Sequence, residues 1–291
     1  MSKIVLGDNQ YGKAETHVVR VTKSGSTHEI TDLNVSIALA GDFSASHHTG
    51  DNSKVVPTDT QKNTVFAFAK ESPPGEPEDF ALRLARHFAR DFEVVSRARV
   101  DVEEYPWTRI TVAGKPHPHA FVRAGVERRL ATATCTKNAE WVVGGITDLV
   151  VLKSTGSEFW GYPRDRYTTL EETHDRVLAT ALTARWRYAS AAPNWAESFA
   201  EARRHLLETF AVKHSLALQQ TLYAMGEAVL KARTEIVEIR LSMPNKHHFT
   251  VDLAPFGLTN DNEVFYASDR PYGLIEGTVT RDDAPEPGFA W

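Results

Sequence analysis

The sequence is poor in cysteine. Its 291 residues include a single one, Cys135, which excludes a disulfide within the chain and the zinc or iron–sulfur sites that several thiolates build. So sparse a use of cysteine is typical of a reducing compartment. Long hydrophobic runs are missing as well. The longest, residues 141–152, contains Thr147 and Asp148 and is too short for a bilayer-spanning helix, which needs about 20 residues. The sequence therefore predicts no membrane span.

Neither sign of charge is in large excess, since 33 lysines and arginines face 38 aspartates and glutamates for a formal net charge of -5. This balance does not favour a nucleic-acid partner or an anionic membrane, although it is compatible with a local basic pocket for one small anion. A hydrophobic fraction of 42% and a charged fraction of 24% are ordinary for a globular protein and exclude collagen, disorder and coiled coil. The length suggests about two domains, or one large one.

Common catalytic motifs are also missing: the sequence has no glycine-rich phosphate loop, no HExxH helix and no GxSxG elbow. Among the 12 histidines, His117 and His119 lie two residues apart. In an extended segment both rings would point to one face and could bind a metal ion. We prefer the interpretation that this segment is the polar start of a strand, because no carboxylate or thiolate at a recognisable spacing completes a metal site. His47 and His48 indicate an exposed loop.

Hydrophobic spacing predicts the secondary structure. Every second residue from 33 to 39 is hydrophobic, as in a half-buried strand, whereas Phe80, Leu84, Phe88 and Phe92 follow at steps of four, as on one buried face of a helix. Strands are predicted for two segments within 17–40 and for 94–103, 107–113, 120–135, 141–153, 237–243 and 249–253, with a turn at 244–246. Helices are predicted for 58–71, for a segment after residues 73–75, and for 169–181, 194–212 and 215–233.

The order of these elements is strand-strand-helix-helix-strand-strand, and it occurs twice, with an extra helix in the second copy. No repeat of residues accompanies this order. Runs of strands separated by runs of helices favour an α+β fold with antiparallel sheets and helices on one face. A doubly wound parallel sheet is not favoured, because its strands and helices would alternate singly.

Two polar segments near the N-terminus are candidates for a site. Residues 58–61 have the spacing of a capping box, which predicts that Thr58 caps the helix. A helix N-terminus also offers free backbone N–H groups and a positive dipole end, so Thr58 and Asp59 could bind a small anion. Lys13 by itself indicates only a surface lysine. It could serve as a general base only if burial or a neighbouring cation favoured its neutral form.

Four further positions have a structural explanation when each is taken alone. Arg176 follows Glu172 by four residues on a predicted helix, so a surface ion pair explains it, whereas its planar guanidinium could also grip two acceptors of a ligand. Gln219 indicates an exposed helix position, Phe159 a core aromatic and Asn245 a turn residue.

These positions belong to short motifs that run in one order along the chain: Tyr11-Gly12-Lys13, Val56-Pro57-Thr58-Asp59-Thr60, Trp107-Thr108-Arg109, Lys115-Pro116-His117-Pro118-His119, Phe159-Trp160-Gly161, Asp175-Arg176, Gln219, and Pro244-Asn245-Lys246-His247. On these motifs the sequence resembles the urate oxidase (uricase) family. The resemblance extends from Tyr11 to His247, which is most of the chain. The Lys-Pro-His-Pro-His and Asn-Lys-His segments are specific in combination.

The resemblance implies the tunnelling fold (T-fold), with two tandem ββααββ units, here residues 1–135 and 136–291. Four chains would form a barrel around a central tunnel. Active sites would lie between subunits, where one chain supplies Lys13 and Thr58 and its neighbour most of the rest. The family oxidises urate with dioxygen and water to 5-hydroxyisourate and hydrogen peroxide, a step of purine degradation, without a metal or an organic cofactor. No nucleic acid or membrane is implied as a partner.

The resemblance also assigns roles to residues. The substrate-binding residues would be Thr58, Asp59, Phe159, Arg176, Leu218, Gln219 and Asn245. Arg176 would donate to one edge of urate, the amide of Gln219 would match the opposite edge, and Phe159 would stack on the ring. The backbone N–H of Asp59 would donate to urate, and the Leu218 main chain would lie near it. Asn245 would hold dioxygen, and then water, above the ring.

The catalytic residues implied are Lys13, Thr58 and His247. Neutral Lys13 would take a proton through Thr58 and leave an electron-rich urate, which can give one electron to dioxygen directly. His247 would either shuttle protons or orient Lys13, and the sequence leaves these two alternatives open.

One departure from the family is Leu218, which stands where many members have valine. The change is small if the backbone makes the contact. The peroxisomal C-terminal tripeptide of eukaryotic members is absent, and residues 1–8 do not resemble a signal peptide, so we expect a bacterial, cytoplasmic enzyme. Two alternatives are a zinc enzyme of the same fold that acts on pterins through His117 and His119, and a purine-binding module without catalysis. The single cysteine gives the first little support, and the complete relay argues against the second.

Overall fold

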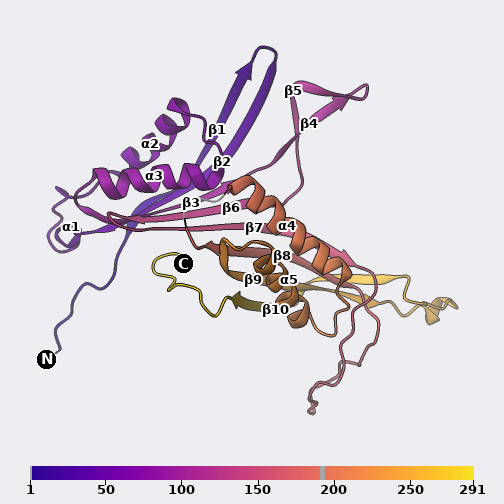
Figure 1. The fold of residues 1–291 in the computed structure, drawn as a ribbon. Helices are drawn as coiled ribbons and strands as arrows, with labels where there is room; N and C mark the ends of the chain where they lie inside the picture. The colour runs from indigo at the N-terminus through magenta and orange to yellow at the C-terminus, as the bar shows by residue number, and fades with distance from the viewer. Residues whose placement is uncertain (1, 191–193) are drawn as a thin grey trace. The chain divides into compact units, whose positions relative to one another are not determined.

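The computed structural model describes residues 2–190 and 194–291. Contacts within the chain divide it into two compact units. Unit 1 comprises Met1–Gly145, Arg187–Ala196 and Pro285–Trp291, and unit 2 comprises Ile146–Trp186 and Glu197–Ala284. Each unit combines helices with antiparallel strands (Figure 1), which confirms the predicted α+β class. In the part of the chain that is described, no helix is both long and apolar enough to cross a membrane.

Unit 1 contains β1 (Tyr11–Ser24), β2 (Thr27–Gly41), α1 (Ser44–His48), α2 (Thr58–Glu71), α3 (Pro77–Asp91), β3 (Val95–Glu104), β4 (Trp107–Val112), β5 (Lys115–Arg123), β6 (Arg128–Thr136) and the start of β7 (Glu140–Lys153). The order of its main strands is β1-β2-β3-β6-β7, and β4 pairs with β5 in a separate two-stranded sheet. Helix α2 packs on β1, and α3 packs on β3 and β6 (Figure 1). The predicted stripe of α3 is confirmed for Phe80, Leu84 and Phe88, which are fully buried, whereas Phe92 follows the helix and is half-buried.

Unit 2 contains the rest of β7, most of β8 (Leu178–Tyr188), α4 (Trp195–Val212) from its third residue, α5 (Leu218–Ala232), β9 (Ile236–Thr250), the short 3-10 helix η1 (Ala254–Phe256) and β10 (Phe265–Thr280). Its strands have the order β7-β8-β9-β10. Helix α5 packs on β9 and β10. It approaches closely at Gly226, where an added Cβ would lie 2.6 Å from Cγ2 of Val279 in β10. This close approach holds the middle of α5 against β10.

The helix predicted for residues 169–181 is wrong. The described chain has no helix from the end of β7 to Val177 and then enters β8, so the extra helix predicted for the second half is not formed in these residues. The alanines and leucines of this region favour a helix locally, but alternate side chains of Leu178–Tyr188 are buried, and this packing overrides the local preference. Glu172 and Arg176 therefore form no helical ion pair. Glu172 instead accepts a hydrogen bond from the backbone N–H of Gly161 at 2.9 Å.

Other boundaries differ in smaller ways. The strand predicted for 120–135 is two strands, β5 and β6, separated at Gly125, whose φ of 87° breaks the extended chain. The turn predicted at 244–246 is wrong, because β9 continues through Pro244 and Asn245, which pair with Leu274 and Gly273 of β10. Strand β10 has no counterpart in the prediction, since most of its side chains are exposed and hydrophobic alternation is weak. His47 and His48 close the short helix α1 instead of lying in a loop.

A buried carboxyl group makes the stability of unit 1 sensitive to pH. Glu78 is fully buried in the first turn of α3, and its Oε2 lies 2.6 Å from Nη2 of Arg129. Burial raises the pKa of Glu78 to about 7 despite the charge of Arg129. A carboxyl group with a raised pKa stabilises the folded state fully below its unfolded pKa, and this contribution is lost as pH rises through the folded value.

We therefore expect the Glu78→Gln variant to gain thermal stability relative to the parent chain as pH rises from about 5 to about 8. Glutamine keeps the shape of the side chain and stays neutral, so the variant lacks this loss. The measurement is the unfolding temperature of both proteins across that pH range. Parallel curves for the two proteins would contradict the prediction.

Candidate active site

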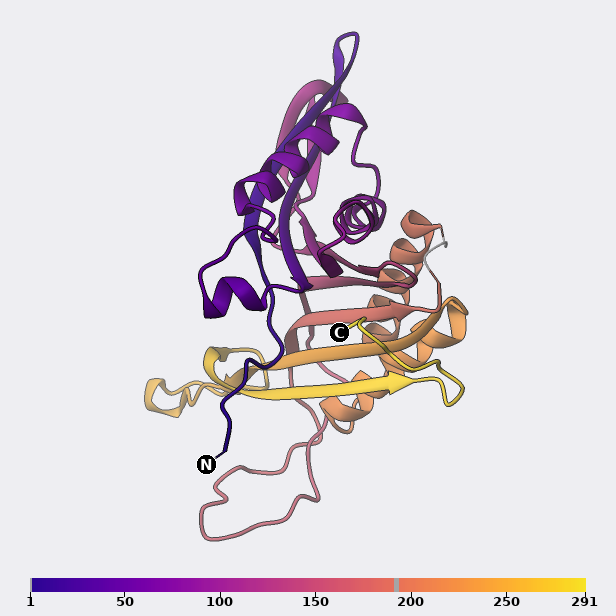
Figure 2. The same cartoon turned by 90° about the vertical axis from the view of Figure 1, so that its left-hand side faces the viewer.

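A pocket in unit 2 with a volume of about 840 Å³ gathers most of the predicted site residues. Three parts of the unit form it: the irregular segment between β7 and β8, the start of α5, and strands β9 and β10. Figure 2 shows the irregular segment as a long loop that extends from the ends of β7 and β8. The predicted residues that line the pocket are Phe159, Arg176, Leu218, Gln219, Asn245 and His247.

Phe159 and Arg176 are placed side by side by backbone hydrogen bonds within the loop. Phe159 and Thr173 exchange two of them, at 2.8 and 3.0 Å, and the backbone N–H of Arg176 donates to the carbonyl oxygen of Ser157 at 2.9 Å. Nε of Arg176 also donates to Oγ of Ser157 at 3.2 Å. The guanidinium carbon lies 5.1 Å from the centre of the Phe159 ring, within the range of a cation–π contact. The loop therefore presents a flat ring and a planar cation together.

Asn245 and His247 come from β9, two residues apart, so their side chains share one face of the strand. Burial and the positive charge of Arg176 lower the pKa of His247, with a smaller contribution from His248. The ring of His247 stacks on Phe249, with centroids 5.6 Å apart. A neutral imidazole has one donor and one acceptor nitrogen, so His247 can pass a proton in either direction.

Leu218 and Gln219 are the first two residues of α5, after the N-cap residue Ala217. The first backbone N–H groups of a helix have no partner within it, and they lie at the positive end of its dipole. Leu218 is buried, so its backbone rather than its side chain is suited to a polar ligand, whereas the Gln219 amide is exposed. This end of the pocket therefore offers backbone donors and a mixed donor–acceptor amide.

The other three predicted residues, Lys13, Thr58 and Asp59, belong to unit 1 and do not line this pocket. Lys13 is half-buried in β1, and Thr58 and Asp59 are the first, exposed residues of α2. The predicted capping role of Thr58 is wrong. Pro57 is the N-cap, no side chain caps the helix, and Gln61 donates instead to the carbonyl oxygen of Val56 at 3.3 Å. The ring of Pro57 restricts the φ angle at the N-cap, so the chain enters α2 there without a capping side chain.

Lys13 and the start of α2 are tied together through Tyr11. The Tyr11 hydroxyl donates to the carbonyl oxygen of Val56 at 3.1 Å, which links the strand of Lys13 to the segment that enters α2. The pKa of Asp59 is lowered mainly by Lys62 and Asn63, and the charge of Lys13 adds to this. Lys13 is thus close enough to Asp59 to interact with it electrostatically.

The backbone around Lys13 is irregular. The pairing of β1 with β2 shifts register between Lys13 and Thr16, as at a β-bulge, and Glu15 has a φ of 55°. A Cβ added at Gly12 would lie 1.7 Å from the carbonyl oxygen of Ile37, so only glycine fits there. Bulges of this kind redirect side chains and are frequent next to active sites.

The histidines considered for a metal site lie on β5. The ring centroids of His117 and His119 are 4.5 Å apart. A third histidine, His28, has its ring centroid 5.7 Å from that of His119. Within residues 2–190 and 194–291, no group of three or more histidine, cysteine, aspartate or glutamate side chains has an arrangement that could hold a metal ion.

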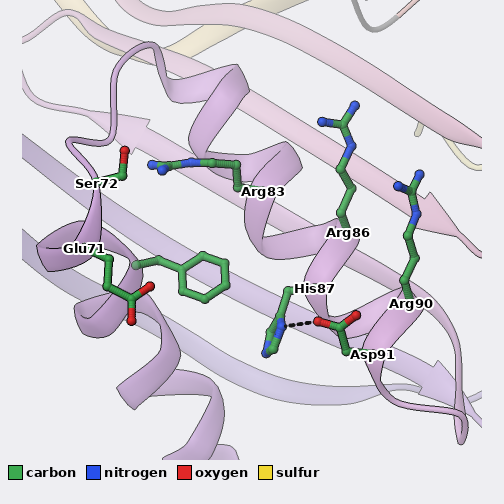
Figure 3. A pocket seen from close by; sticks show the side chains of 8 residues that line it. Glu71, Ser72, Arg83, Arg86, His87, Arg90 and Asp91 are labelled. Carbon is green, nitrogen blue, oxygen red and sulfur yellow. Dashed lines mark hydrogen bonds and ion pairs between the residues drawn. The ribbon is translucent and has the colours of Figure 1, made fainter.

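A second pocket, with a volume of about 400 Å³, lies between α2 and α3 in unit 1 and contains no predicted site residue (Figure 3). Several of its charges are already paired. Arg86 and Arg90 both bind Glu140, and Nδ1 of His87 lies 2.8 Å from Asp91. Arg86 and Arg90 thus link α3 to the start of β7, and His87 and Asp91 pair within α3.

Residues that organise the larger pocket were not predicted. Glu158, Thr173 and His214 shape it through contacts with the loop. Glu158 adjoins the Phe159 motif, but His214 lies 56 residues further along the chain, and no spacing in the sequence joins the two. Their relation follows only from the fold.

One pocket thus brings together an arginine, an aromatic ring, an amide and a histidine. Such a pocket is typical of the class of proteins that bind a small, flat ligand rich in hydrogen-bonding groups. The family model described as Uricase matches residues 9–134 and 142–276. The uricase of Arthrobacter globiformis is 53% identical over 281 residues, which cover 97% of this chain and 91% of that protein. The uricase of Dictyostelium discoideum is 38% identical over 95% of this chain and 97% of its own length. This chain belongs to the uricase family.

Solved structures agree with this assignment. The crystal structure of Arthrobacter globiformis uricase superposes with a TM-score of 0.94 at 53% identity, with 98% of each chain covered. The uricase of Bacillus fastidious has a TM-score of 0.79 over 95% of this chain and 94% of its own, but its 23% identity supports the fold alone.

Proposed function

We propose that this protein is a urate oxidase, which converts urate, dioxygen and water to 5-hydroxyisourate and hydrogen peroxide in purine degradation. The observation that carries the proposal is the pocket of unit 2, which Arg176, Phe159 and Gln219 line together. Membership of the uricase family supports the same reaction.

The pocket residues would bind urate on three sides. Arg176 donates parallel N–H bonds to one edge of the anion, and such charge-assisted pairs are strong and directional. The Gln219 amide and the main chain of Leu218 serve the opposite edge, and Phe159 stacks on the ring. Asn245 holds dioxygen, and then water, above the ring. The helix start at Thr58 and Asp59 supplies a further backbone donor.

Lys13, Thr58 and His247 would carry protons. In this mechanism neutral Lys13 accepts a proton from urate through the Thr58 hydroxyl, and the electron-rich urate transfers an electron to dioxygen. The neutral state of His247, favoured by burial and by Arg176, suits it to exchange a proton with this relay. The bulge at Lys13 and the hydrogen bond from Tyr11 to Val56 support the placement of the first two members.

The active site would be completed by a second subunit. Lys13 and Thr58 do not line the pocket of unit 2, which fits a site where one chain supplies them and its neighbour supplies the pocket. We propose a homotetramer of T-fold chains, with tandem ββααββ units at residues 1–135 and 136–291. The order β7-β8-α4-α5-β9-β10 supports the second unit. The single cysteine supports the cytoplasm as the location of the enzyme.

The proposed chemistry needs no metal and no organic cofactor. We therefore expect protein treated with a chelator to consume urate in aerated buffer and to form hydrogen peroxide in equal amounts. The measurement follows urate absorbance and peroxide together, before and after addition of divalent metal ions. Activity that returned only with a metal would favour a metalloenzyme. Absence of turnover with a bound urate analogue would favour a binding module.

A further inference from the structure

Glu158 does not line the unit 2 pocket, but its carboxylate joins the loop of Phe159 and Arg176 to the segment before α5. We propose that Glu158 is a positioning residue for urate binding, because it locks the loop of Phe159 and Arg176 to the segment that leads into α5 and Gln219. The inference deepens the proposed urate oxidase function and rests on it.

The backbone makes the first part of this connection. Ser157 and Ser215 form an isolated parallel bridge, in which the N–H of Glu158 donates to the Ser215 carbonyl oxygen at 2.7 Å and the N–H of Ser215 donates to that of Gly156 at 2.9 Å. Both serines are fully buried. Oγ1 of Thr221 in α5 donates to Oγ of Ser215 at 2.8 Å, so the bridge continues into the helix that carries Gln219.

The side chain of Glu158 adds the second part. Its Oε1 accepts from Nε2 of His214 at 2.6 Å, and its Oε2 accepts from Nε1 of Trp160 at 2.6 Å and lies 3.3 Å from Nδ1 of His174. One carboxylate therefore contacts the loop at two places, Trp160 and His174, and also His214 in the segment before α5. Its side chain is 17% exposed, whereas that of His214 is 59% exposed. These three donors lower the pKa of Glu158 to about 2, so the carboxylate is ionised at neutral pH.

The place of Glu158 and of the Ser157–Ser215 bridge in the chain determines which binding residues they position. Glu158 directly precedes Phe159, and Ser157 holds the guanidinium of Arg176. His214 and Ser215 lie just before the residues that start α5. Urate would be held between these two sides, so their separation has to match the width of the ligand. Groups that are already ordered bind a ligand more tightly than groups that must be ordered on binding. Lys13 and Thr58 lie on other elements, in unit 1, so these two members of the proposed proton relay do not contact Glu158 or the residues that it holds.

The test combines steady-state kinetics with urate and direct binding of a urate analogue that is not oxidised. In Glu158→Gln one carboxylate oxygen becomes an N–H donor that faces other donors. We expect this variant to raise KM and the Kd of the analogue about tenfold, the effect of one charge-assisted hydrogen bond, and to change kcat less than about threefold. His214→Ala should do the same, and the double variant should be no worse than either single one. His214→Gln, which keeps an N–H donor, should restore part of the affinity.

The matched control is Glu201→Gln on α4, which removes a carboxylate that binds Arg204 and does not line the pocket. It should leave KM unchanged. An unchanged KM in Glu158→Gln, a fall in kcat alone, or strictly additive effects of the two substitutions would overturn the inference. Failure of the proposed function is distinguishable, because the parent protein would then not oxidise urate at all.

Discussion

Replacement of Lys13 by methionine is expected to lower the turnover of urate about a hundredfold or more, while a urate analogue still binds with the affinity of the parent protein. Methionine preserves the length and much of the volume of the lysine stem but cannot accept a proton. General base catalysis contributes about 10²- to 10⁴-fold to a rate, and this contribution is what the variant should lose. Lys13 does not line the pocket formed by Arg176 and Gln219, so ligand binding there should persist.

Two further variants test whether the loss belongs to a relay. Thr58→Ala removes the hydroxyl through which the proton would pass, and it should reduce kcat with little effect on the Kd of the analogue. Lys231→Met, a substitution of an exposed lysine paired with Glu227 on α5, should leave both quantities unchanged. Steady-state kinetics and calorimetric titration with the analogue make the comparison. Loss of analogue binding in Lys13→Met would show that Lys13 holds the ligand rather than its proton.

The fold was most predictable where hydrophobic periodicity was strong and long. The alternation in residues 33–39 and the stripe of Phe80, Leu84 and Phe88 correspond to buried faces of β2 and α3. Prediction failed where tertiary contacts overrode local preference. Leu178–Tyr188 contains good helix formers but is a strand buried between neighbours, and Pro244 lies in a strand although proline usually interrupts one.

In the candidate site, too, some features were predictable from the sequence and others depend on tertiary contacts. Its residues were predicted through short motifs, spread from Tyr11 to His247, that resemble the uricase family, and the fold brings six of the nine to one pocket. What the sequence could not indicate is the support around them. The contact of Glu158 with His214 joins residues 56 positions apart, and the bulge beside Lys13 depends on pairing with β2. Such contacts depend on register and packing, which no local pattern specifies.

The roles of Arg176 as a ligand clamp and as a charge beside His247 can be separated by substitution. Arg176→Ala should weaken binding of urate and of its analogue about 10- to 100-fold, because a pair of charge-assisted hydrogen bonds is lost. It should also raise the pKa of His247, since the positive charge of Arg176 helps to lower it. The pH below which His247 is protonated would therefore move upward, and the activity that depends on the neutral ring would begin at a higher pH.

Arg176→Lys distinguishes the two effects, because lysine keeps the charge but not the planar fork. This variant should bind the analogue nearly as weakly as Arg176→Ala, whereas His247 should titrate close to its position in the parent protein. Histidine NMR titration, with His247→Gln to assign the resonance, measures the pKa, and calorimetry measures the affinity. If Arg176→Ala bound the analogue normally, the clamp would be refuted. If both variants shifted His247 equally, the coupling would come from altered burial, because the two side chains differ in charge.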